Sequence, residues 1–120
     1  MTNADAHRVE IESNPHRLRV IHRGITIADT SRGLTLKETG LAEVFYFPRE
    51  DVNMTRFERS DHMTHCPYKG DASHFHLRME DDGVVLNAAW SYEAPFEAVA
   101  RVKGYLAFYA SRVDRIDQTS

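Results

Sequence analysis

The chain has 120 residues, of which 42% are hydrophobic and 28% are charged. This length and composition predict one globular domain over residues 1–120, large enough to bury a core without a metal or a disulfide. The net charge of -3 supplies no positive field to attract nucleic acid, and no apolar stretch is long enough to cross a bilayer. The single cysteine, Cys66, excludes an internal disulfide and suits a reducing compartment. We therefore expect a cytoplasmic domain without nucleic-acid or membrane partners.

Alternating hydrophobic and polar residues predict half-buried strands along most of the chain. Residues 1–7 lack this pattern, and we expect them to be frayed. A turn is expected at 13–16, and a tight hairpin at 22–25 contains Gly24, which can take a positive φ. A connection over 51–53 leads to 54–58. In chain order, the expected strands are 8–12, 17–22, 25–30, 34–38, 44–47, 73–79, 84–90 and 105–111.

Only one segment has a helical pattern. Pro95 suits a first helical position, and Gly104 can end the helix. The predicted face of this helix comprises Phe96, Val99, Ala100 and Lys103. About eight short strands, with turns every 8–12 residues and one short helix near the C-terminus, predict a mainly β antiparallel fold. The candidate architectures are a two-sheet sandwich, a tent and an open barrel.

Four stretches of the chain, within about 9–114, form a distinctive pattern. The most specific are a Thr-x-Cys-Pro-Tyr-Lys-Gly run at 64–70 and a Trp-x-Tyr-x-x-Pro run at 90–95. The order and spacing of the stretches resemble the family called domain of unknown function 427, also labelled nucleotidyltransferase 9. The resemblance implies a small, mostly β, bacterial or fungal protein with a candidate pocket and no established activity. The four stretches are 28–30 with 38–39, 46–48 with 51–52, 64–70, and 89–95 with 107–109.

The nucleotidyltransferase label implies a chemistry that can be compared with the residues. Metal-dependent nucleotidyl transfer needs two carboxylates that hold Mg²⁺ over a triphosphate, and a phosphate cradle that is usually rich in glycine. Asp29 and Asp51 stand alone in the sequence, 80–83 is typical of a hairpin tip, and no glycine-rich loop precedes a helix. The catalytic residues therefore stay unknown and we predict no cofactor, with nucleotidyl transfer kept as an alternative.

The turn at 66–70 has two interpretations. In the structural one, Pro67 fixes φ, Gly70 relieves the exit, and Cys66 is a small buried side chain. In the catalytic one, Cys66 is a thiolate nucleophile activated by Lys69, but the sequence shows no oriented base. We favour the structural interpretation for Cys66 and expect Lys69 to point its ammonium group into a pocket.

Three tyrosines and the single tryptophan lie at strand ends or turns within the motifs. Such rings usually belong to the core, but the hydroxyl or N–H group of each buried ring needs a hydrogen-bond partner. A concave site lined by the rings and reached by Glu38 and Lys69 would fit a small planar aromatic or anionic molecule. We expect the segments 66–70 and 90–95 to meet around this site. The candidate ligand-binding residues are Glu38, Tyr46, Cys66, Tyr68, Lys69, Trp90 and Tyr92.

Four histidines raise the question of a metal site. His74 and His76 alternate on one predicted strand, and His62 or His65 with Cys66 would complete a tetrahedral set. Paired histidines in a half-buried sheet more often face solvent, and these histidines are not part of the family pattern. We predict no metal, although the sequence does not determine whether the four histidines bind one.

These observations favour a small soluble β domain that binds a small molecule. Two alternatives belong to other classes. One is an enzyme, either a nucleotidyltransferase or a thiol-dependent catalyst that uses Cys66. The other is a homodimeric interaction module that presents a sheet edge or an aromatic patch to a second copy. The sequence identifies neither the ligand nor a reaction.

Overall fold

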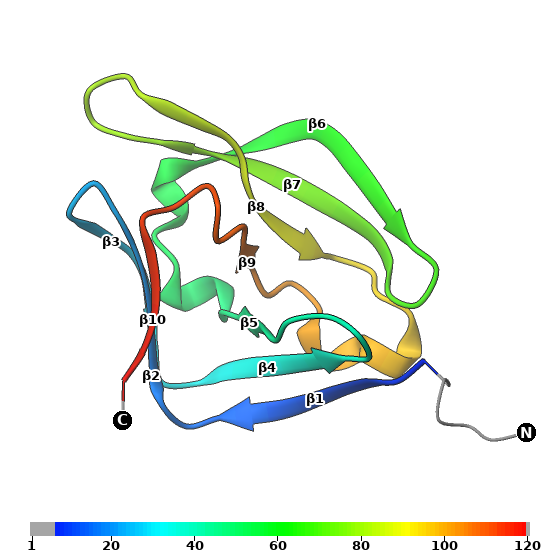
Figure 1. Ribbon diagram of the computed structural model, residues 1–120. Helices are drawn as coiled ribbons and strands as arrows, with labels where there is room; N and C mark the ends of the chain where they lie inside the picture. Colours follow the sequence, from blue (N-terminus) through cyan, green and yellow to red (C-terminus); the bar gives the residue numbers. More distant parts are fainter. Residues whose placement is uncertain (1–6, 120) are drawn as a thin grey trace, which may run out of the picture.

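The computed structural model describes residues 7–119, which form ten strands and three short 3-10 helices (Figure 1). The mainly β antiparallel class is confirmed. The predicted frayed segment lies outside the described residues except for His7. In chain order the elements are β1 (Val9–Asn14), β2 (Arg17–His22), β3 (Ile25–Thr30), β4 (Gly33–Glu38), β5 (Val44–Tyr46), η1 (Arg49–Asp51), η2 (Met54–Arg56), β6 (Phe57–Cys66), β7 (Gly70–Arg78), β8 (Val84–Tyr92), η3 (Glu97–Val102), β9 (Ala107–Phe108) and β10 (Arg115–Thr119).

The strands form three antiparallel sheets, with the orders β1-β4-β5, β10-β2-β3 and β6-β7-β8-β9. Figure 1 shows the sheets as sides around a shared interior, in which β5 and β9 lie. Two hydrogen bonds between the backbones of Phe47 and Leu106, with N···O distances of 2.7 and 2.9 Å, join the end of β5 to the start of β9. The first and third sheets therefore continue into each other, and none of the sheets within residues 7–119 closes into a barrel.

The predicted turn at 13–16 is a corner between two sheets. β1 pairs with β4 whereas β2 pairs with β3 and β10, so the chain changes sheet at Pro15, which has no N–H for a ladder. Asn14 holds this corner, because its Nδ2 donates to Thr35 Oγ1 at 2.9 Å and to Gln118 Oε1 at 2.8 Å. Its Oδ1 accepts the His16 N–H at 2.9 Å. This corner therefore separates the sheet of β1 from the sheet of β2.

The interior contains two hydrophobic clusters. The first includes Leu18 and Phe47, and the Phe47 ring meets the Phe108 ring edge to face, with centroids 5.5 Å apart. The second cluster lies where β4, β5, β7 and β8 face η3, and it includes Tyr46 and Tyr92. Burial of large side chains is the main favourable term in folding. The second cluster thus fixes several residues that the sequence assigns to the candidate pocket.

The C-terminal quarter differs from the prediction. The predicted helix over 95–103 is the 3-10 helix η3, broken at Val99 (φ -124°, ψ 26°). Its buried residues are Val99 and Val102, three positions apart as a repeat of three residues per turn requires. Phe96, expected on the same helix face as Val99, is 47% exposed, whereas Val99 is buried. The strand expected at 105–111 is the shorter β9, and β10 was not predicted. No helix within residues 7–119 has the length and apolar character to cross a membrane.

Candidate functional site

The two most specific motifs meet where the β6–β7 turn approaches the end of β8. Ala72 of β7 pairs with Tyr92 of β8. The Phe96 N–H, just beyond β8, donates to the Lys69 carbonyl at 3.0 Å. Gly70 takes φ +110°, a conformation that side chains disfavour, and this lets the turn lie against the backbone of the second motif. The predicted meeting of 66–70 and 90–95 is confirmed.

A buried ion pair lies beside this junction. Glu38 ends β4, where it pairs with Val9 of β1. The Lys69 Nζ donates to Glu38 Oε1, and the two side chains are only 9% and 8% exposed. Two charges removed from water stabilise a fold only while they remain together. The Lys69 ammonium, which the sequence predicts to face a ligand, therefore has its charge balanced within the protein.

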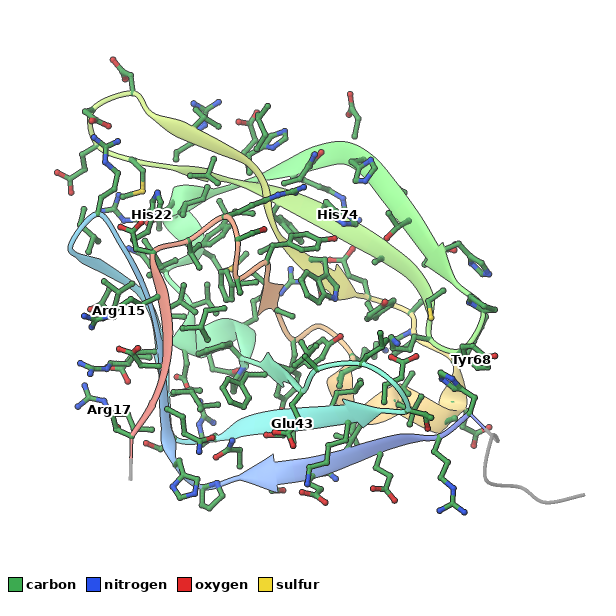
Figure 2. The ribbon with its side chains drawn as sticks, viewed as in Figure 1. Arg17, His22, Glu43, Tyr68, His74 and Arg115 are labelled. Carbon is green, nitrogen blue, oxygen red and sulfur yellow. The ribbon has the colours of Figure 1, made fainter. Side chains whose placement is uncertain are left out.

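His7 covers one face of Tyr68 and contacts Glu38 of the ion pair. The two rings stack with centroids 3.7 Å apart and an interplanar angle of 13°. His7 Nε2 lies 2.9 Å from Glu38 Oε2, within ion-pair distance but not aligned as a hydrogen bond. Tyr68 is still 49% exposed, and Figure 2 shows it at the end of the molecule where the β6–β7 turn approaches β1. The chain itself therefore places a planar ring between Tyr68 and Glu38.

Three aromatic side chains lie behind the ion pair, within the second cluster. Trp90 Nε1 donates to Tyr46 Oη at 3.3 Å, and the two rings meet edge to face. Burial raises the pKa of Tyr46 above its ordinary value. Burial also raises the pKa of Tyr92 to about 12, with Cys66 and Glu38 adding to the rise. Both phenols are therefore neutral near pH 7, and they can donate hydrogen bonds but do not supply a phenolate base.

Cys66 completes the predicted set. It ends β6, pairs with Gly70 of β7 and is half-buried against the second cluster. Tyr46 and Tyr92 thus belong to the second cluster with Cys66 and Trp90 packed against it, Lys69 and Glu38 form the ion pair, and Tyr68 is a surface residue. A hollow of about 370 Å³ is lined by Glu38 together with Arg8 and Lys37, and by none of the other six predicted residues. That these residues bind a ligand stays a prediction.

His74 and His76 of β7 have different environments. His74 is 1% exposed, and its Nε2 lies 2.9 Å from Tyr109 Oη. Burial lowers the pKa of His74, and the charge of the neighbouring His62 lowers it further. His76 Nδ1 accepts the Asn87 N–H at 3.0 Å. The ladder between β7 and β8 shifts register between Phe75 and Leu77, so the simple alternation that the sequence predicts for these two histidines is interrupted.

The two histidines of β6 are separated from each other. The His62 ring meets the His74 ring at a centroid distance of 4.6 Å. His65 Nδ1 lies 2.7 Å from Asp71 Oδ1 at the surface. Across residues 7–119, no three His, Cys, Asp or Glu side chains converge as metal ligands would.

Asp29 and Asp51, which stand apart in the sequence, lie close in the fold. Together with Glu50 they line a hollow of about 370 Å³, so the expectation that they stand alone is wrong in space. Asp29 accepts hydrogen bonds from Arg17 at 3.0 and 2.7 Å, which lower the pKa of this carboxyl. Asp51 accepts from Arg32 Nη2 at 3.1 Å. Both carboxylates therefore form ion pairs with arginines.

A comparison with family models gives one match. The model described as a domain of unknown function (DUF427), with the label NTP_transf_9, covers residues 10–119. The chain belongs to this family. The match extends from β1 into β10 and confirms the resemblance drawn from the motifs. A comparison with curated proteins found no match. The family's description assigns no reaction, so the role of the residues has to be argued from their contacts.

Proposed function

We propose that the domain binds a small planar molecule at the mouth formed by Tyr68, Glu38 and Lys69. The observation that carries this proposal is the His7 ring, stacked at 3.7 Å on Tyr68 with Nε2 2.9 Å from Glu38 Oε2. A free planar ligand in the same position would gain the same stacking and the same contact with the carboxylate. The exposed half of Tyr68 gives such a ligand access from solvent.

The charges at the mouth favour a ligand that donates hydrogen bonds or carries positive charge. Glu38 Oε1 accepts from Lys69, and Oε2 faces the position of the His7 ring. A carboxylate or phosphate on the ligand would meet Glu38 and would find the Lys69 charge already balanced. A planar cation or a neutral donor would find a free acceptor. The contacts therefore support a planar ligand, as the sequence predicts, more than they support an anionic one.

The residues behind the mouth hold it in one geometry. Trp90 and Tyr46 bond to each other, and Tyr92 packs in the same cluster. The Phe96 N–H fixes the Lys69 carbonyl. Sites whose polar groups are fixed before binding lose less entropy when the ligand arrives. In this proposal the buried motif residues support the site, and Tyr68 and Glu38 contact the ligand.

The experiment compares three rings of similar size and different charge. Benzamidine is positive, phenol is neutral and benzoate is negative. His7→Ala vacates the ring position without removing a backbone hydrogen bond, and His16→Ala, at an exposed corner histidine, is the matched control. We expect benzamidine to raise the melting temperature of His7→Ala more than benzoate does. A dissociation constant of about 1 mM, at 10 mM ligand, corresponds to about 1.4 kcal/mol.

Two further measurements decide the outcome. Tyr68→Ala in the His7→Ala background removes the stacking surface and should abolish the response to benzamidine. A preference for benzoate would restore the anionic form of the prediction, with Lys69 as the recognising group. The absence of any response to the three rings would contradict the proposal. The other predictions stay predictions, because no contact of this kind supports them. They are nucleotidyl transfer, thiol chemistry at Cys66, pairing with a second copy and a cytoplasmic location.

A further inference from the structure

A second surface feature lies outside the motifs. Two hollows, of about 460 and 470 Å³, share Arg32 and Tyr105 in their walls. Arg101 lines the first hollow, and Arg49 and Lys103 line the second. We call this continuous feature the basic groove. Its walls come from the corner between β1 and β2, the β3–β4 turn, η1 and the segment from η3 to β9, and none of the seven candidate pocket residues contributes to it.

Two of the four cations in the basic groove are balanced by carboxylates. Arg32 pairs with Asp51 at 3.1 Å. Arg49 pairs with Glu93 at 3.3 Å, and its Nε donates to the Gly104 carbonyl at 2.9 Å. These bonds hold both guanidinium groups in place. Because each arginine has five N–H donors, each keeps donors beyond those bonds.

The other two cations carry uncompensated charge. Arg101 donates to the Ile11 carbonyl at 2.8 Å and to Ser13 Oγ at 2.9 Å, which are both neutral acceptors. Neither Arg101 nor Lys103 forms an ion pair with another residue in the range 7–119. Among the residues that line the two hollows, Glu50 is the single carboxylate. The basic groove is therefore locally positive in a chain whose net charge is -3.

We propose that the basic groove binds a phosphorylated small molecule with at least two negative charges. Arg101, Arg32 and Lys103 would hold the phosphate oxygens, since guanidinium groups recognise them in bidentate fashion and a lysine adds a point charge. Tyr105, shared by the two hollows, offers a surface for the organic part of the ligand. The combined hollows have the volume of a small-molecule site, and the negative net charge of the chain opposes binding of a nucleic acid.

The probe for this site is inorganic pyrophosphate, followed by amide chemical shifts at constant ionic strength. We expect saturable shifts confined to the segments that line the groove, 13–15, 31–34, 48–50 and 101–105. Lys103→Gln removes an exposed cation without a partner, and Arg101→Gln removes the fixed one. Each should weaken binding by at least about fivefold, as expected for loss of a charge-assisted contact. Arg115→Gln, at an exposed arginine paired with Asp117 outside the groove, should change the affinity less than about twofold.

Three results would overturn the proposal. The first is the absence of saturable shifts at these amides, and the second is equal weakening by Arg115→Gln. The third is tighter binding of a single-stranded oligonucleotide that displaces pyrophosphate, which would assign the groove to a nucleic acid. Arg101 bonds to Ile11 and Ser13 of β1, so Arg101→Gln can weaken binding by disturbing that strand. Lys103 bonds to no described side chain, so a loss of affinity in Lys103→Gln reports the lost charge alone.

Discussion

Replacement of Lys69 by methionine tests whether the buried ion pair holds the candidate site together. Methionine keeps most of the apolar stem but lacks the ammonium, so the Glu38 side chain, 8% exposed, retains a charge with only His7 beside it. Removal of one partner from a buried pair costs about 3–5 kcal/mol. Because His7 gives partial compensation, we expect the lower end, about 3 kcal/mol. For a domain of this size, that loss lowers the melting temperature by about 10–15 °C.

The assay is urea unfolding followed by the fluorescence of Trp90, the single tryptophan. Its ring lies 4.5 Å from Tyr109 inside the fold, so its emission reports the tertiary structure. Lys37→Met is the matched control, because Lys37 pairs with Glu12 at the surface, 3.1 Å away, and its side chain is 41% exposed. That surface pair should contribute less than about 1 kcal/mol.

A double variant separates the lost charge pair from the lost side chain. Glu38→Gln combined with Lys69→Met removes both charges and leaves a polar group of similar size. We expect it to recover most of the stability that Lys69→Met loses, because the uncompensated carboxylate is gone. A loss below about 1 kcal/mol in Lys69→Met, or a double variant no more stable than the single one, would refute the reasoning.

Two further predictions concern pH. Burial raises the pKa of Tyr92 to about 12, so the folded state keeps a proton that the unfolded phenol releases near pH 10. The free energy of unfolding should therefore fall by on the order of 2 kcal/mol as the pH rises from about 10 to about 12. Tyr92→Phe should remove that component in urea titrations, and an unchanged slope would count against it. Burial lowers the pKa of His74, so its neutral form contributes stability above about pH 6.5 that is lost as the pH falls through the lower folded value. His74→Leu should flatten this acid limb, and an equally steep limb would contradict the assignment.

The sequence predicted the strands that have a buried face and missed those without one. Leu18 and Val20 of β2 alternate with exposed or half-buried polar residues, and both are fully buried. β6 is an edge strand with mostly exposed residues, so its sequence lacks an alternating signal beyond Phe57. β10 likewise has no buried residue, and it is a strand because it pairs with β2. Such strands form because they pair with distant segments of the chain. The local sequence pattern carries no information about that pairing.

The contacts among the candidate residues were not predicted from the sequence, and their role in binding stays a prediction. Lys69 and Glu38 were both expected to reach a ligand, but their pairing with each other across 31 residues of sequence was not foreseen. His7 lies in a segment without periodicity, so no local signal indicates its stacking on Tyr68. The basic groove was missed for the same reason, because its cations come from three connections that meet only in the folded chain.

The segment from Phe96 to Gly104 connects the two proposed sites. At its start the Phe96 N–H donates to the Lys69 carbonyl, and at its end the Gly104 N–H donates to the Tyr92 carbonyl, each at 3.0 Å. Between these bonds Val102 is fully buried, and the groove cations Arg101 of η3 and Lys103, directly after η3, line the groove. Transmission between two sites requires an element with two arrangements. Because this segment is held by hydrogen bonds at both ends and is buried at Val102, we expect it to position both sites without coupling them.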